Sequence, residues 1–261
     1  RRLRRRRNSD SNSNSTNSHT RRHLVEAFGT LKTLVVRPIS PNGAAVTAST
    51  AKLRNDVFED DVCLKSQMEA CSHQQLTIQA ADVGDGGVVE VQIDVNPLVG
   101  SGDRNANRGE ISASARTAAA ALYGGGPDGD DLGANYDLVI FCVPPNGGWD
   151  AFAYQNRYDS YYNKDRCSIS GVLMHEVGHN FGLGHSGTGG GDVYSDLTGY
   201  MGAGSTADDG PRKCYNAVKS YEIGWYDQQI ASFDPIEAAV GNPTSFVLNG
   251  VGDYKVDGSS T

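Results

Sequence analysis

The segment that decides the fold is HEVGHNFGLGH, residues 175–185. On a helix, His175 and His179 would lie one turn apart on the same face, so both imidazoles could reach one metal ion. Gly182 permits the left-handed conformation that ends a helix and reverses the chain, which would bring His185 round as a third ligand. Three neutral imidazoles with one open position are typical of a catalytic zinc site.

The residues around the motif indicate how it would work. A helix beginning at Ser170, a plausible N-cap, would run to about Phe181. Glu176 would project beside the histidine face, where its carboxylate could take a proton from a water that the metal activates at neutral pH. Replacing Glu176 should therefore keep the metal and abolish turnover. A structural zinc site and three unrelated histidines are the alternatives, but three of the six histidines fall within these eleven residues.

The composition and charge of the chain limit the kinds of partner that it can bind. The chain has 261 residues, of which 38% are apolar and 21% charged, enough for a sizeable core. Residues 1–23 contain eight arginines and one aspartate, a charge of +7, so the remainder carries −15 of the total of −8. Because the chain outside residues 1–23 is so acidic, it is not expected to bind nucleic acid or anionic membranes. The longest apolar run, residues 138–143, is far too short to cross a bilayer.

Residues 1–23 form a basic, Asn/Ser-rich segment that we expect to be disordered, because it has almost no apolar content. Taken alone, it could be a binding arm for nucleic acid or membrane, a nuclear-import signal or a linker cut by a processing protease. Since the first residue is arginine, we expect that sequence upstream has been removed or omitted.

Hydrophobic patterning predicts an α/β sheet in which strands alternate with helices. The expected strands are 31–36 (ended by Pro38), 76–80, 88–95 after a turn at 85–87, 138–143 and 151–154, and the expected helices are 52–70 and 111–123. The acidic loop 128–131 faintly resembles a calcium loop, but an ordinary acidic turn is favoured because the distal glutamate of an EF-hand is missing. Surface Ca²⁺ sites therefore stay without support.

The five cysteines contain no CxxC pair, so they give no sign of a thiolate zinc site. A disulfide between Cys63 and Cys71 is one option, and the odd count leaves at least one thiol free or paired outside the chain. A secreted domain with one or two disulfides fits this pattern, and so does a cytosolic protein with buried thiols.

The extended histidine motif resembles that of the metzincin metalloproteases, which also carry a methionine turn beneath the metal. Met201, sixteen residues after His185 in the stretch GYMG, fits that turn. Finer features resemble the gametolysin family, secreted proteases that in algae act on extracellular-matrix and cell-wall glycoproteins. The matching stretches are HSG (185–187), YSDLTGYMG (194–202), KCYNAVKS (213–220), IGWY (223–226), FCVPP (141–145) and AFAY (151–154).

The resemblance covers roughly residues 30–230 and implies specific roles. It makes His175, His179 and His185 the zinc ligands, Glu176 the catalytic base and Met201 the residue of the methionine turn. It implies a mixed twisted sheet with helices, an active-site helix along the floor of the cleft, and a smaller C-terminal subdomain after Gly182. Some metzincins carry a fifth ligand, a tyrosine two residues after the methionine, but Ala203 occupies that position here.

These implications give a domain plan and a function. We expect a linker over 1–23, now favoured as a propeptide cleavage region, a catalytic domain over 24–230, and an incomplete C-terminal region over 231–261 with strand-like residues at 244–248. The expected function is a secreted zinc endopeptidase, made as a zymogen, that cuts matrix or cell-wall glycoproteins. The alternatives are an inactive matrix-binding protein on the same scaffold and, more weakly, a nucleic-acid binder acting through the basic arm.

Overall fold

The computed structural model describes residues 25–98, 107–126, 129, 131–203, 207–210, 212–227 and 245. One six-stranded sheet runs through the described chain in the order β2-β1-β4-β6-β5, with β3 also paired to β1. Its strands are β1 (Gly29–Ile39), β2 (Leu76–Ala80), β3 (Val88–Gln92), β4 (Leu138–Val143), β5 (Ala151–Ala153) and β6 (Asp159–Asn163). All pairings are parallel except that of β5 with β6, so the sheet is mixed, as the sequence predicts.

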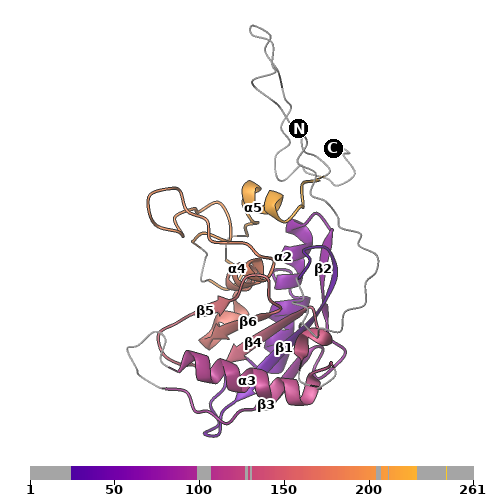
Figure 1. The fold of residues 1–261 in the computed structure, drawn as a ribbon, viewed down its shortest axis with the longest axis vertical. Coiled ribbons are helices and arrows are strands. Elements are labelled where there is room, and N and C mark those ends of the chain that lie inside the picture. Colours follow the sequence, from indigo (N-terminus) through magenta and orange to yellow (C-terminus); the bar gives the residue numbers. More distant parts are fainter. Residues whose placement is uncertain are drawn as a thin grey trace, which may run out of the picture.

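Helices cover both faces of this sheet (Figure 1). The long helix α3 (Arg108–Tyr123) packs on one face against a core that includes Leu34, Val139 and Phe141. Two others, α2 (Leu64–Cys71) and α4 (Ser170–Asn180), pack on the opposite face. Strand β4 is buried along its whole length because it lies between these two cores. The prediction of a mixed sheet with helices and an active-site helix is confirmed.

Strand β1 is longer than predicted. The sequence places its end at Pro38, yet β1 continues to Ile39, with Pro38 opposite Val91 of β3. A proline lacks the N–H that a strand with two neighbours would use. Strand β4 pairs only with residues as far as Val36, so Pro38 lies where β3 is its one partner among the described strands, and the missing donor breaks no ladder.

The expected helix over residues 52–70 is wrong as a single element. The chain forms α1 (Thr50–Arg54), continues as the π-helical turn η1 (Asn55–Glu59), and breaks before α2. The break has a local cause: Cys63 caps α2 by accepting a hydrogen bond from the Ser66 N–H, while the Ser66 hydroxyl accepts one from the Cys63 N–H. Neither β6 nor the short helix α5 (Ala217–Glu222) was predicted from the sequence.

The disulfides are not the pair that the spacing suggested. Cys71 is bonded to Cys214 and Cys142 to Cys167, whereas Cys63 is a free, buried thiol. Cys63 and Cys71 lie at opposite ends of α2, about 12 Å apart by helical rise, which is too far for a disulfide. The first bond ties α2 to the chain after the methionine turn, and the second ties β4 to η3 (Lys164–Ser168), directly before α4.

Several expectations fall outside the described residues: the 1–23 linker, the strand at 244–248, nearly all of the 231–261 region, and Asp128 and Asp130 of the acidic loop. The side chain of Asp131 accepts a hydrogen bond from the Gly133 N–H and caps the short helix η2 (Leu132–Ala134). Within the part of the chain that is described, no helix is both long and apolar enough to cross a membrane.

Candidate metal centre

Helix α4 carries His175 and His179 through the interior of the protein, and His185 follows the end of the helix. Its N-cap is Ile169, which makes no side-chain capping bond, so Ser170 is the first helical residue and not the predicted cap. The helix ends at Asn180, and Gly182 has φ +90°, the left-handed conformation that the sequence predicts there. This positive φ favours glycine, and a Cβ on Gly182 would in addition have to displace the side-chain oxygen of Asn156, 2.6 Å away.

The turn brings the three histidines together. One potential ligand atom each from His175, His179 and His185 lies within 4.8 Å of the others. The ring centroids are 4.9 Å apart for His175 and His179, 5.3 Å for His175 and His185, and 4.8 Å for His179 and His185. Among the described residues this is the one group of three or more histidine, cysteine or acidic side chains that could hold a metal ion.

Hydrogen bonds orient two of the rings. Nδ1 of His175 lies 2.6 Å from the carbonyl oxygen of Tyr200, and Nδ1 of His179 lies 2.8 Å from that of Leu183. Because a carbonyl only accepts, both Nδ1 atoms must carry the proton, which leaves each Nε2 lone pair free. This is the arrangement in which a histidine binds a metal while its other nitrogen is held by the protein.

The electrostatics of the histidines also suit a metal. Burial lowers the pKa of His175 to about 4, and burial likewise lowers the pKa values of His179 and His185. All three imidazoles are therefore neutral near pH 7, and a neutral imidazole is the form that binds a metal. The donor set, three imidazole nitrogens converging from a helix and a turn, matches the chemistry of zinc.

Glu176 is buried beside the cluster, with 6% of its surface exposed. Burial raises the pKa of its carboxyl group to about 8, and a hydrogen bond from the backbone N–H of Ala153 in β5 opposes this rise. The Oε2 atom has no hydrogen-bond partner among the described residues. A nearby cation would stabilise the ionised carboxylate. The unpartnered Oε2 is thus an observation that a metal with its water would explain.

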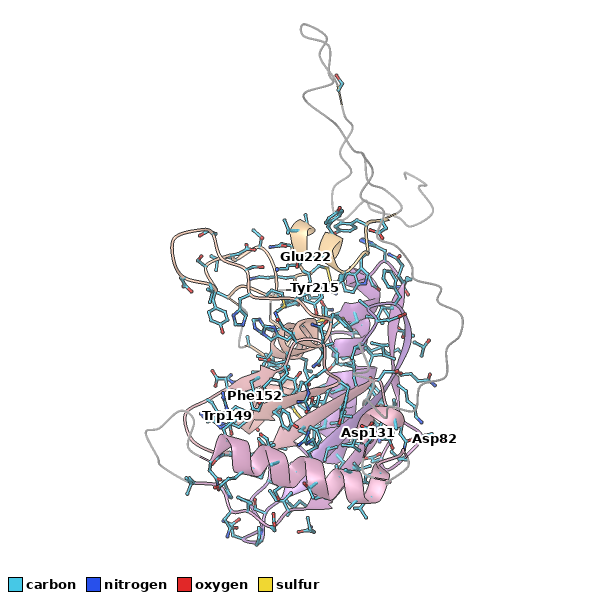
Figure 2. All side chains as sticks on the ribbon, in the orientation of Figure 1. Asp82, Asp131, Trp149, Phe152, Tyr215 and Glu222 are labelled. Atoms are coloured by element: carbon cyan, nitrogen blue, oxygen red, sulfur yellow. A yellow bond between two sulfur atoms is a disulfide. The ribbon has the colours of Figure 1, made fainter. Side chains whose placement is uncertain are left out.

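Met201 lies in a turn beneath α4 and is fully buried. Its carbonyl accepts a hydrogen bond from the Ser186 N–H, one residue after the third histidine. A Cβ on Gly178 would overlap the Met201 sulfur and come 3.1 Å from the hydroxyl of Tyr215. Tyr215 is labelled in Figure 2, and its hydroxyl donates a 2.7 Å hydrogen bond to the Met174 carbonyl in α4. Gly178 therefore lets the methionine turn approach the helix closely.

Tyr194 is a site residue to which sequence reasoning assigned no role. Its ring centroid lies 4.1 Å from that of His185 and 6.1 Å from that of His175. The loop that carries it is held by Asp196, whose carboxylate accepts hydrogen bonds from Thr198 and from the side chain of Asn216. Loop geometry of this kind leaves no periodic pattern in the sequence, so the position of Tyr194 could not be predicted.

Two orienting hydrogen bonds on a cluster of imidazoles, with a buried carboxylate alongside, are the arrangement expected of a metal-dependent hydrolase. Among family models, the one described as gametolysin peptidase M11 matches residues 32–249. The chain belongs to this family of metallopeptidases, and the predicted metalloendopeptidase and gametolysin-like resemblance are confirmed. No curated protein matches the chain.

Proposed function

We propose that this peptidase is a zinc-dependent endopeptidase in which His175, His179 and His185 hold the metal and Glu176 is the general base. We further propose that it is secreted and cuts extracellular-matrix or cell-wall glycoproteins, as the sequence resemblance implies. The observation that supports the catalytic part is the pair of Nδ1 hydrogen bonds, which leave the Nε2 atoms of His175 and His179 free in a cluster whose potential ligand atoms lie within 4.8 Å of one another.

A bound zinc ion would activate water and polarise the scissile carbonyl. Glu176 would accept a proton from the attacking water and return it to the amide nitrogen of the leaving peptide. The Ala153 N–H would hold the Glu176 carboxylate in position, leaving Oε2 to receive the proton. Burial of Glu176 keeps bulk water away from this transfer.

Secretion is supported by the two disulfides, because such bonds persist in oxidising compartments. Protein substrates follow from the family, while the glycoprotein class rests on the resemblance alone. The charge of −15 carried outside residues 1–23 argues against nucleic acid and anionic membranes as partners of the catalytic domain. Synthesis as a zymogen and cleavage in the arginine-rich segment stay predictions.

The second candidate function is an inactive matrix-binding protein on the same scaffold. Decay of activity usually removes the base or a ligand, yet Glu176 is present and buried, and all three histidines lie in one cluster. We therefore favour the enzyme.

The test uses the full 261-residue chain and gelatin as a general protein substrate. We expect cleavage that stops with a chelator and returns with zinc. Glu176→Gln should retain one zinc per chain, measured by elemental analysis, but lose turnover, whereas Glu110→Gln on the exposed surface of α3 should leave both unchanged. Cleavage that ignores the chelator, or zinc-loaded folded protein that cuts nothing, would overturn the proposal.

A further inference from the structure

A hollow lies on the α3 side of the edge strand β5, whereas the histidines lie on the α4 side. It is a cavity of about 280 Å³ between α3 and the β5–β6 hairpin. The side chains that matter in it are Arg108, Ser112 and Arg116 from α3, and Phe152, Tyr154 and Arg157 from the hairpin. Phe152, labelled in Figure 2, lies where the end of the sheet meets α3.

The cavity carries an excess of positive charge. Arg157 is paired with the buried Asp159 through two hydrogen bonds of 2.9 and 3.0 Å, and the Tyr161 hydroxyl donates another to the same carboxylate at 2.8 Å. Arg108 and Arg116 form no ion pair with any described residue. These two guanidinium groups therefore stay uncompensated in a part of the chain whose net charge is −15.

The cavity also contains an unpartnered buried donor. Ser112 is only 6% exposed, and its hydroxyl has no hydrogen-bond partner among the described residues. A buried hydroxyl without a partner costs free energy, so a ligand that accepts its hydrogen bond would be favoured. Arg108 is already held in place, with its guanidinium 4.6 Å from the centre of the Phe152 ring. Guanidinium groups, here with Arg108 held by the Phe152 ring, and a buried hydroxyl without a partner are donors that recognise a carboxylate.

Strand β5 connects this cavity to the candidate metal centre. Phe152 and Tyr154 line the cavity, and Ala153 between them donates its N–H to Glu176. Side chains of β5 alternate in the same way: Ala151 packs with the core on the α4 side, and Phe152 with the core on the α3 side. An acidic group in the cavity would therefore lie one strand residue away from the backbone that holds the base.

The outer edge of β5 is open among the described strands, because β5 is the last strand in the sheet. The Asp150 carbonyl faces β6, where it accepts a hydrogen bond from the Asn163 N–H. By the alternation of an antiparallel pair, the polar backbone groups of Ala151 and the carbonyl of Ala153 face the open edge. An extended peptide that paired there would present alternate side chains to the two faces of the sheet, and those on the α3 face would meet the cavity.

We propose that the cavity between α3 and β5 is a specificity subsite for an acidic side chain, Asp or Glu, of an extended protein substrate. Arg108 and Arg116 would bind the carboxylate, and Ser112 would donate a further hydrogen bond to it. This inference rests on the proposed endopeptidase function, because it needs a peptide lying across β5 at the metal centre.

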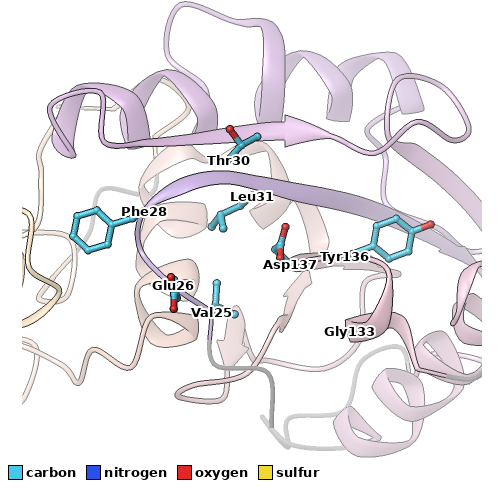
Figure 3. Close-up of a pocket in the computed structure, with 8 residues that line it drawn as sticks. All are labelled: Val25, Glu26, Phe28, Thr30, Leu31, Gly133, Tyr136 and Asp137. Atoms are coloured by element: carbon cyan, nitrogen blue, oxygen red, sulfur yellow. The ribbon is translucent and has the colours of Figure 1, made fainter. Parts of the chain in front are cut away.

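Another hollow, at the start of β1, does not support a comparable inference (Figure 3). Its volume is about 300 Å³, and the acidic residues Glu26 and Asp137 line it. Asp137 already accepts a hydrogen bond from the Lys32 N–H at 2.8 Å. None of the residues lining it is a buried polar group without a partner.

The test uses pairs of peptides that differ only by Asp or Asn at one position, scanned along both sides of the scissile bond. With zinc-loaded full-length protein, we expect kcat/KM to rise about tenfold for Asp over Asn at one position, the scale of a charge-assisted hydrogen bond. Arg108→Gln and Arg116→Gln should each remove most of that preference, so that the Asp and Asn peptides are cut with similar kcat/KM. Lys65→Gln on α2, which removes a charge on the opposite face of the sheet, is the matched control.

Charge reversal adds a result that loss of folding could not imitate. Arg116→Glu should lower kcat/KM for the Asp peptide and raise it for a Lys peptide. Equal cleavage of Asp and Asn peptides at every position would overturn the subsite, as would a preference that both arginine variants keep. Retention of an acidic polysaccharide without peptide discrimination would also overturn it. Failure to cut any peptide would instead contradict the proposed function.

Discussion

Nδ1 of His175 lies 2.6 Å from the carbonyl oxygen of Tyr200, the residue directly before Met201. This hydrogen bond joins the first histidine of α4 to the methionine turn, across 25 residues of chain. A second link lies one turn further along the helix, where the Met201 sulfur packs against Gly178. The turn therefore supports the helix at two points, so a change in its packing should disturb the orientation of the histidines.

Gly178→Ala should destabilise the protein and weaken metal binding together. The added Cβ would overlap the Met201 sulfur and crowd the Tyr215 hydroxyl, and overpacking of a filled core costs about 1–3 kcal/mol. The check is the free energy of unfolding in denaturant, with zinc affinity measured by competition with a chelator. Gly109→Ala in α3 is the control, since a Cβ there meets nothing within 4 Å. Unchanged stability and affinity for Gly178→Ala would contradict this account of the turn.

Tyr194 should act through its ring, because that ring packs on His185 at 4.1 Å while the imidazole of His185 has no hydrogen-bond partner among the described residues. Tyr194→Ala should weaken zinc binding by about tenfold, the usual scale for losing a group that orients a ligand. Tyr194→Phe keeps the ring and should keep the affinity. Equilibrium zinc titration of both variants decides the matter, and an equal loss in the two would show that the hydroxyl is the important group.

The helix of the candidate site was predictable because its signals are local. The spacing of His175 and His179, and the glycine that reverses the chain before His185, are readable without knowledge of the rest of the fold. Strand β4 was equally readable, as an apolar run buried on both faces. Its neighbour β6 was missed, because DSYYN has no alternation of polar and apolar residues and both faces of the strand are buried. Two of its polar side chains are used in hydrogen bonds: the Asp159 carboxylate accepts from Arg157, and the Asn163 amide donates to the carbonyls of Asn146 and Trp149.

What the sequence could not supply is information carried across long separations. Cys71 and Cys214 are 143 residues apart, and only the folded chain selects that pairing over the nearer Cys63. The position of Tyr194 depends on how Asp196 folds its loop back on Asn216. The cavity that contains Arg108 and Arg116 is formed by α3 together with the β5–β6 hairpin, which begins some thirty residues after α3 ends. No short sequence motif therefore marks it.

Glu176 should be essential for turnover and dispensable for the metal. Glu176→Gln keeps the size of the side chain but cannot accept a proton. Loss of a general base typically lowers kcat by about 10²- to 10⁴-fold. Glu176→Asp should recover only part of the loss, because the shorter chain moves the carboxylate away from the Ala153 N–H. Steady-state kinetics on one peptide, with zinc content measured in parallel, test this. If the variant lost zinc along with activity, Glu176 would be required for metal binding, and this prediction would be wrong.

The two disulfides should contribute unequally to stability. The chain-entropy model gives about 5 kcal/mol for the loop of 143 residues closed by Cys71 and Cys214, and about 3.5 kcal/mol for the loop of 25 residues closed by Cys142 and Cys167. The paired variants Cys71→Ser/Cys214→Ser and Cys142→Ser/Cys167→Ser should follow that order in free energy of unfolding. The first pair should also lose zinc more readily, because its disulfide holds the chain that supplies Tyr215 beneath α4. The opposite order would mean that strain or residual structure outweighs loop entropy here. Equal zinc retention in the two paired variants would mean that the methionine turn does not depend on its tie to α2.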